Sequence, residues 1–243
     1  MRRIRADILL VERGLAESRE RARRLIMAGR ARSGTNVLVK PSTLLPEDAP
    51  LELLEPERYV SRGGYKLEAA LRQFGLDVRG MRCLDVGAST GGFTDCLLQH
   101  GAREVVAVDV GRGQLHAKLR GDPRVVPLEG VNARELPDVG PIDLVVCDVS
   151  FISLRLVLPA IARRVPPSTP VVALFKPQFE AGRELVPRGG VIRDERLRQR
   201  LLAEFLTWAE SGGWAVVGAV DSPIAGADGN REVLCHLKTP EGG

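Results

Sequence analysis

Between residues 82 and 175, short apolar runs alternate with segments of helical periodicity. Such runs are typical of buried strands, and their alternation with helices predicts an α/β fold with a parallel sheet covered on both faces. Helices are expected after Gly63, after Phe93 and in the basic stretch that leads to Glu210. Strands are expected at 82–86, 104–110, 125–128, 142–147, 171–175, 214–220 and 232–237.

The first 55 residues follow a different pattern. Two amphipathic segments predict short helices, one over 6–14 and one that begins after the N-cap Ser18 and ends at Gly29. Two apolar runs, 37–45 and 51–54, predict small strands. We therefore expect a small α+β domain over residues 1–55, a linker over 56–62 and a large domain over 63–243.

Positive charge is concentrated at the start of the chain. Residues 1–40 hold eleven Arg or Lys against four Asp or Glu, a local charge of +7 in a chain of net charge +4. Two arginine-bearing helices beside a small sheet would suit RNA phosphates, but a solvated charged helix has the same composition, so the charge pattern leaves both open. The RNA-contact candidates are Arg3, Arg5, Arg19, Arg23, Arg24, Arg30, Arg32 and Arg62.

A glycine-rich turn follows the strand expected at 82–86. A strand that ends in such a turn at the start of a helix directs free backbone N–H groups at one point, which suits a small, partly anionic ligand. The spacing Gly87-x-x-x-Gly91-Gly92 matches neither the phosphate loop, which needs a lysine, nor the dinucleotide fingerprint. Asp109 ends the next strand, where doubly wound folds hold ribose hydroxyls. A purely structural tight turn is the competing interpretation.

This turn resembles the first motif of S-adenosylmethionine (SAM) methyltransferases, in which it holds the methionine end of the cofactor. The resemblance implies a Rossmann-like, SAM-dependent methyltransferase sheet with SAM as the cofactor. The positions that match the SAM-binding residues are Asp85, Gly87, Ala88, Ser89, Gly91, Gly92, Phe93, Thr94, Asp109, Asn132 and Asp148.

Charged residues also follow two later strands. Asp148 comes after 142–147 and Lys176 after 171–175, and the carboxyl ends of parallel strands meet at one edge of the sheet. The segment after Asp148 lacks the Pro-Pro-Tyr/Phe of adenine-amine methyltransferases, and no cysteine stands where a cysteine-nucleophile base methylase needs one. A lysine can accept the proton of a ribose 2′-hydroxyl when burial and a neighbouring cation favour its neutral form. Lys66 and Lys176 are candidates for such a pair, although Lys66 alone also reads as a surface residue of a helix.

Two family resemblances extend this interpretation. Residues 3 to about 55 resemble the RNA-binding domain of ribosomal protein S-four, although Arg32-Ser33-Gly34 replaces its usual Val-Asn-Gly hairpin. Segments across the whole chain resemble the hemolysin-A/TlyA family of FtsJ-like rRNA ribose methyltransferases: Ser61–Lys66, the turn after Asp85, Asp148–Ser153, Phe175–Glu180 and Gly229–Glu232.

This second resemblance implies a function. The family's catalytic tetrad falls on Lys66, Asp148, Lys176 and Glu232, with Lys176 as the proton acceptor. The implied substrate is a cytidine 2′-hydroxyl in ribosomal RNA, either naked or within a ribosomal subunit. An RNA-binding assembly factor with a cofactor pocket but no turnover stays an alternative.

Other classes find less support. No apolar run approaches the ~20 residues of a membrane helix, and the N-terminus lacks the apolar core of a secretory signal, so a cytoplasmic protein is expected. A membrane-lysing protein would need an insertion segment, and none is found. Four unpaired cysteines and three scattered histidines predict reduced core thiols and no metal site. The oligomeric state is left open.

Overall fold

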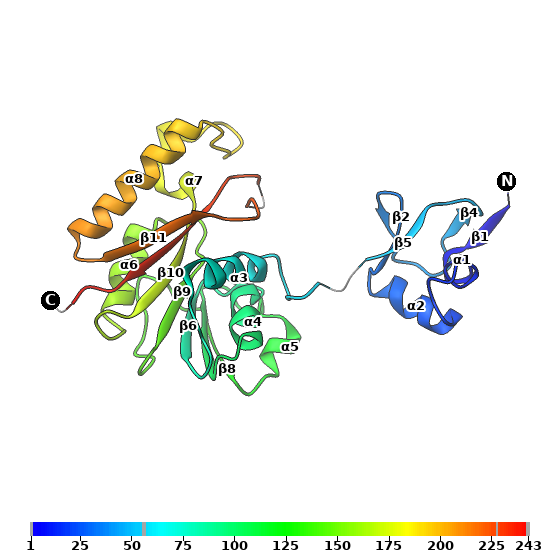
Figure 1. The fold of residues 1–243 in the computed structure, drawn as a ribbon, viewed down its shortest axis with the longest axis horizontal. Helices are drawn as coiled ribbons and strands as arrows, with labels where there is room; N and C mark the ends of the chain where they lie inside the picture. Colours follow the sequence, from blue (N-terminus) through cyan, green and yellow to red (C-terminus); the bar gives the residue numbers. More distant parts are fainter. Residues whose placement is uncertain (1, 55–56, 227, 242–243) are drawn as a thin grey trace. The chain divides into compact units, whose positions relative to one another are not determined.

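The computed structural model describes residues 2–54, 57–226 and 228–241, and the chain divides into two compact units, Met1–Arg58 and Tyr59–Gly243 (Figure 1). The division falls inside the linker predicted for 56–62. Tyr59 is 2% exposed and packs edge-on against Tyr65, with ring centroids 5.1 Å apart. The second half of the predicted linker therefore belongs to the large unit, and residue 56 lies outside the described residues.

The small unit combines two helices with two small antiparallel sheets. In chain order its elements are β1 (Arg3–Arg5), α1 (Ala6–Glu12), α2 (Arg19–Met27), β2 (Ala31–Ser33), β3 (Asn36–Val37), β4 (Leu44–Pro46) and β5 (Leu51–Leu53). Strand β1 pairs with β4, and β2 lies between β3 and β5. The single strand predicted for 37–45 is thus two strands in two sheets, because the chain turns between them. As predicted, the hydroxyl of Ser18 caps α2 by accepting a hydrogen bond from the Arg21 N–H.

The large unit is a seven-stranded sheet with helices on both faces. Its strands are β6 (Arg82–Val86), β7 (Glu104–Asp109), β8 (Val125–Glu129), β9 (Leu144–Cys147), β10 (Pro170–Phe175), β11 (Ala215–Asp221) and β12 (Val233–Lys238). Its helices are α3 (Gly63–Phe74), α4 (Gly92–Gln99), α5 (Ala117–Arg120), α6 (Leu154–Ala162), α7 (Pro177–Glu180), α8 (Glu195–Ser211) and the 3₁₀ helix η1 (Arg183–Leu185). No helix in the described part of the chain is both long and apolar enough to cross a bilayer.

The strand order is β11-β12-β10-β9-β6-β7-β8. Strands β10, β9, β6, β7 and β8 pair in parallel, whereas β12 runs antiparallel to both β10 and β11. The predicted parallel sheet is confirmed as a mostly parallel one, and β12 is the strand that runs the other way. The described residues of its connection to β11 form no helix that would carry the chain back across the sheet, so the chain returns in the opposite direction.

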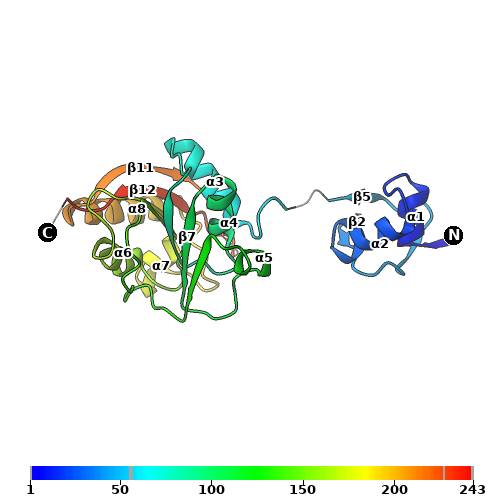
Figure 2. The ribbon, with the colours of Figure 1, turned by 90° about the horizontal axis from the view of Figure 1, so that it is seen from below.

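Side chains that alternate along the strands supply two cores. One face packs against α6 and α8, and the other packs against α3, α4 and α5 (Figures 1 and 2). Val86 and Val145 face the first core, while Cys83 and Val146 face the second. Burial on both faces explains why these strands are almost continuously apolar in sequence.

The topology brings four distant segments to one edge of the sheet. The chain runs outward from β6 to β7 and β8 on one side and from β9 to β10 on the other, which makes the junction of β6 and β9 the switch point where doubly wound folds bind ligands. Val86 pairs with Cys147 at this edge, and Phe175 pairs with Val233. The residues just beyond these strand ends form the site.

Candidate active site

The turn between β6 and α4 has an unusual backbone. Gly87, Ser89 and Gly91 all have positive φ angles, of 87°, 48° and 98°. A Cβ at Gly87 would lie 2.5 Å from the carbonyl oxygen of Asp148, so only glycine fits there. The turn is held by Asp109, whose carboxylate accepts the Ser89 N–H at 2.8 Å. This arrangement leaves an open cradle at the N-terminus of α4.

Asp85 lies buried beneath the turn. Its Oδ2 accepts a hydrogen bond from Thr94 Oγ1 at 2.6 Å, and its Oδ1 has no hydrogen-bond partner among the described residues. Burial first, and then the charges of Asp148 and Asp109, raise the pKa of Asp85 to about 7 against the opposing hydrogen bond from Thr94. Three acids close together make this end of the sheet favourable for a cation.

A cavity of about 890 Å³ opens beside the turn, and we call it the large cavity. Its volume lies in the range of roughly 300–1,000 Å³ that small-molecule sites occupy. The residues that line it include Gly87, Ser89, Asp109, Val110, Gln114, Val131, Asn132, Arg134, Asp148, Ser150, Phe151 and Phe179. It thus combines acceptors at Asp109 and Asn132 with apolar walls.

A second cavity, of about 510 Å³, shares Gly87, Ser89, Asp148 and Ser150 with the first. We call it the small cavity. Its other lining residues are Ser61, Arg62, Gly63, Lys66, Ala88, Thr90, Gly92, Phe93, Lys176 and Ala225. Both lysines predicted to be catalytic therefore line one space that adjoins the large cavity.

Lys176 follows β10 and is 8% exposed. Its Nζ lies 2.7 Å from Asp148 Oδ1 and donates a hydrogen bond of 2.8 Å to Ser150 Oγ. The carboxylate and the hydroxyl come from the segment after β9, which is the parallel neighbour of β10. Two contacts from one segment thus fix the amine at the wall shared by the cavities.

Lys66 forms the second buried pair. On α3, its Nζ lies 2.5 Å from Glu232 Oε2, and the two residues are 8% and 3% exposed. The tetrad implied by the sequence is therefore arranged as two lysine–carboxylate pairs, each joining segments far apart in the chain.

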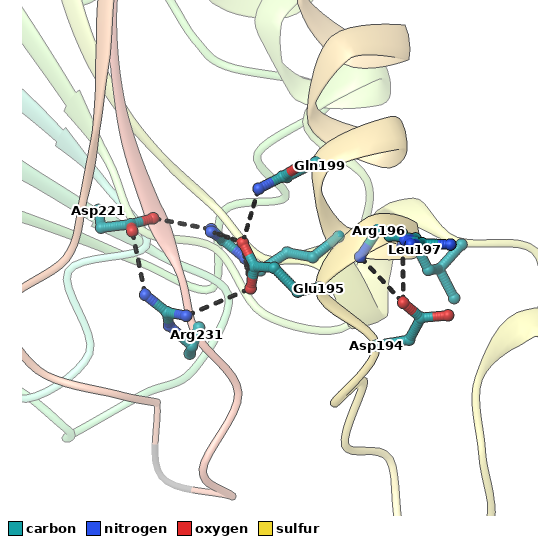
Figure 3. Close-up of polar contacts among 8 residues, drawn as sticks. Asp194, Glu195, Arg196, Leu197, Gln199, Asp221 and Arg231 are labelled. Carbon is teal, nitrogen blue, oxygen red and sulfur yellow. Dashed lines mark hydrogen bonds and ion pairs between the residues drawn. The ribbon is translucent and has the colours of Figure 1, made fainter.

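The chain around Glu232 is held by its neighbours. Arg231 contacts Glu195 and Asp221, each at 3.2 Å (Figure 3), and Arg198, with a side chain only 7% exposed, pairs with the same two acids. These contacts tie the start of β12 to α8 and β11. These ion pairs hold the backbone next to Glu232 in place, and Glu232 in turn positions Lys66.

A known family matches this architecture. The family model of the FtsJ-like methyltransferases matches residues 59–239. The chain belongs to the FtsJ-like methyltransferase family. The 16S/23S rRNA (cytidine-2′-O)-methyltransferase TlyA of Mycobacterium tuberculosis is 49% identical over 98% of this chain and 91% of its own. Hemolysin A of Brachyspira hyodysenteriae is 43% identical over 96% and 99%.

A solved structure of similar sequence has the same fold. A candidate hemolysin from Streptococcus thermophilus is 44% identical, with a TM-score of 0.75 over 99% of this chain and 90% of that chain. The resemblance stated from the sequence, to FtsJ-like methyltransferases of the hemolysin-A/TlyA group, is confirmed.

The cofactor of this FtsJ-like methyltransferase is SAM, and the large cavity fits it. At the turn, the positive N-terminal end of α4 suits a carboxylate, and Asp109 offers acceptor oxygens for ribose hydroxyls. Val110 is 74% exposed and, with Val131, supplies an apolar surface for a base. The described residues contain no group of three or more His, Cys, Asp or Glu that could hold a metal ion.

Not every residue predicted to bind the cofactor reaches a cavity. Among the lining residues of the two cavities, Asp85, Gly91 and Thr94 are missing. Asp85 and Thr94 support the turn from below, and a Cβ at Gly91 would collide with the side chain of Leu119. Conversely, sequence reasoning assigned no role to Ser150 or Phe151, because a contact across 26 residues leaves no local pattern.

Several arginines predicted to bind RNA have partners within the small unit. Arg5 and Arg19 both pair with the fully buried Asp7, at 2.9 and 3.0 Å. The hydrogen bond from Arg5, followed by that from Arg19, lowers the pKa of Asp7 against burial. The remaining pairs are Arg24 with Glu20, Arg32 with Glu52, and Arg30 with the Leu54 carbonyl.

The other candidates differ. Arg3 and Arg23 are exposed, and no ion pair is found for either within residues 2–54. Arg62 lies on the large unit, at the small cavity, where its guanidinium donates to the Ala225 carbonyl at 3.1 Å. These three side chains are the ones best placed to meet phosphate.

Proposed function

We propose that this protein transfers the methyl group of SAM to the 2′-hydroxyl of a cytidine in ribosomal RNA, with Lys176 as the proton acceptor. The observation that carries the proposal is that two buried lysines, each held by a carboxylate, line the small cavity, which adjoins the cavity that fits SAM. The name of the Mycobacterium tuberculosis relative gives the same reaction and both rRNAs as its targets.

The large cavity would hold the cofactor. The N-terminal end of α4 at the glycine turn would attract its carboxylate, Asp109 would bind its ribose and Asn132 its base. When bound, SAM supplies a methyl group already activated on a sulfonium sulfur. The chain's own task is therefore to bring the hydroxyl into line and remove its proton.

Lys176 performs that removal in the proposal. The hydroxyl proton would pass to the lone pair of its Nζ while the ribose oxygen takes the methyl group that SAM would supply, with the thioether as the leaving group. Asp148 and Ser150 orient the amine beforehand. Lys66, held by Glu232, places a second cation near the reacting oxygen.

The small unit would bind the RNA as an S-four-like domain, from residue 1 to about residue 55. Its exposed Arg3 and Arg23 suit phosphate oxygens, and on the large unit Arg62 would offer a further cation at the small cavity. Since ribosomal RNA is the substrate in this proposal, the protein would act in the cytoplasm.

Labelled methyl transfer tests the proposal. The full chain is incubated with methyl-labelled SAM and with 16S or 23S rRNA, naked or within subunits, from cells that lack the protein. We expect label at a cytidine 2′-oxygen with the wild type and none with Lys176→Ala, which should still bind SAM. SAM binding without any labelled RNA would favour an assembly factor instead.

A further inference from the structure

Two segments at the active site are joined at three successive points. Residues 148–154 follow β9 and residues 176–180 follow β10, which are parallel neighbours. The first joint is the contact of Lys176 with Asp148 and Ser150. The second is a ring contact between Phe151 and Phe179, with centroids 5.1 Å apart. The third is the pair of hydrogen bonds that Glu180 accepts from Ser153 and Leu154.

Glu180 binds the far end of the turn with both carboxylate oxygens. Its Oε2 accepts the Ser153 hydroxyl and its Oε1 accepts the Leu154 N–H, each at 2.6 Å. Burial raises the pKa of this carboxyl, while the hydrogen bond from Ser153 opposes the shift. Glu180 lines neither cavity, and its two hydrogen bonds go to the turn.

The turn held in this way is strained. Phe151 has a φ of 62°, a left-handed conformation that costs a non-glycine residue about 1–2 kcal/mol. Its side chain is 90% exposed, so burial does not compensate for the strain. The conformation must therefore be imposed by contacts on either side, of which those of Glu180 with Ser153 and Leu154 are the strongest.

The strained turn decides where Ser150 lies, since Ser150 immediately precedes Phe151. A neutral lysine amine has two N–H bonds and one lone pair. Ser150 Oγ accepts the hydrogen bond that Lys176 makes among the described residues, whereas the 2.7 Å contact with Asp148 Oδ1 lacks hydrogen-bond geometry, so the bond to Ser150 sets the direction of the lone pair. Without Ser150 the amine could rotate about its last bond, and the lone pair would lose its fixed direction.

We propose that Ser150 and Glu180 are positioning residues for methyl transfer: Ser150 orients the amine of Lys176, and Glu180 holds the turn that carries Ser150. The inference rests on the proposed function of Lys176 as the proton acceptor.

Single-turnover methylation of rRNA by the full chain, with SAM affinity measured separately, tests the inference. Ser150→Ala should slow methyl transfer by about 10- to 100-fold while the Kd for SAM stays within about twofold of wild type. Ser150→Thr keeps the hydroxyl and should recover most of the rate. Ser211→Ala, on α8 with its hydroxyl bonded only to a carbonyl of its own helix, should match wild type. A wild-type rate for Ser150→Ala, or no recovery by Ser150→Thr, would overturn the role of Ser150.

A double-mutant cycle tests the link to Glu180. Glu180→Ala should slow methyl transfer, whereas Glu180→Gln, which still offers an oxygen to the Leu154 N–H, should retain more of the rate. If Glu180 acts through Ser150, the double variant Ser150→Ala/Glu180→Ala should be slowed by less than the product of the two single effects. Fully multiplicative effects would overturn the link.

The activity of the wild type separates the two proposals. Methyl transfer by the wild type together with an unaffected Ser150→Ala variant overturns the positioning inference alone. Absence of methyl transfer by the wild type, with SAM bound and rRNA present, overturns the proposed function and the inference with it.

Discussion

The Nζ of Lys66 lies 2.5 Å from Oε2 of Glu232, although 166 positions separate the two residues in the chain. Both side chains are more than nine-tenths buried, and together they join α3 to the start of β12 at the small cavity. A buried pair of this kind adds little net stability compared with apolar residues of similar volume, but losing one partner is costly because the other charge stays buried. Stability alone therefore gives no reason for the pair, whereas the role proposed for Lys66 in methyl transfer does.

Separate measurements of stability and rate should expose this difference. Glu232→Ala should lower the free energy of unfolding by about 3–5 kcal/mol, since it leaves the Lys66 ammonium without its partner. The double variant Lys66→Met/Glu232→Leu should recover most of that stability in urea unfolding, yet methylate rRNA at least 100-fold more slowly than wild type. If the double variant methylates normally, the pair is structural only.

Gly87 should be far less replaceable than another glycine of similar backbone conformation. Gly87→Ala adds a Cβ 2.5 Å from the Asp148 carbonyl oxygen at a φ of 87°, so the cradle must open. Gly75→Ala has a φ of 63° but nothing within 4 Å of the added Cβ. Both variants should lose about 1–2 kcal/mol to backbone strain, whereas only Gly87→Ala should weaken SAM binding by more than about tenfold in calorimetric titration. Equal SAM affinities would contradict the cradle.

The core strands of the large unit could be predicted because the signal for each is local. An apolar run predicts a strand, and the polar residue that ends it is then placed by the geometry of parallel sheets, as happens for Asp109, Asp148 and Lys176. The direction of β12 could not be predicted in this way, because its apolar run has the same composition in either direction. The loop that joins β11 to β12 determines the direction of β12.

The contacts between side chains could not be predicted from the sequence either. Arg19 and Arg23 lie on the same helix and look equivalent as phosphate contacts, but Arg19 is bound to Asp7, twelve residues earlier. The role of Ser150 depends on a strained turn whose cause, Glu180, is 27 residues from Ser153. Contacts of this kind follow from packing, for which neither periodicity nor charge count gives a signal.

Asp85 should make stability fall as pH rises. Because burial raises the pKa of the folded-state carboxyl to about 7, above the ordinary 3.8, the folded protein binds this proton more tightly than the unfolded chain does. The stabilisation is present at pH 4 and is lost progressively up to about pH 7. Asp85→Asn keeps an oxygen that accepts the hydrogen bond from Thr94 but does not titrate. The difference in stability between wild type and this variant therefore isolates the pH dependence that Asp85 causes.

Urea unfolding of wild type and Asp85→Asn at pH 4.5, 6 and 8 provides the measurement. Relative to the variant, the wild type should lose up to about 4 kcal/mol across this range. Parallel stability curves would mean that Asp85 is already ionised in the folded protein at low pH.

Arg23 and Arg19 should fail in different ways when each is replaced by glutamine. Arg23 is exposed, and no ion pair is found for it in residues 2–54, so Arg23→Gln should leave the stability of the protein unchanged. The variant should bind rRNA a few-fold more weakly, and the slope of log affinity against log salt concentration should fall by about 1. Arg19→Gln instead removes a partner of the fully buried Asp7 and should destabilise the small unit by about 1–3 kcal/mol. Its salt slope should stay near that of wild type at temperatures where the unit is folded.

Filter binding of rRNA by the full chain at several salt concentrations, with thermal unfolding of each variant, measures both effects. Identical salt slopes for Arg23→Gln and wild type would mean that Arg23 does not contact RNA phosphates. A reduced salt slope for Arg19→Gln would mean that Arg19 contacts phosphate despite its ion pair with Asp7.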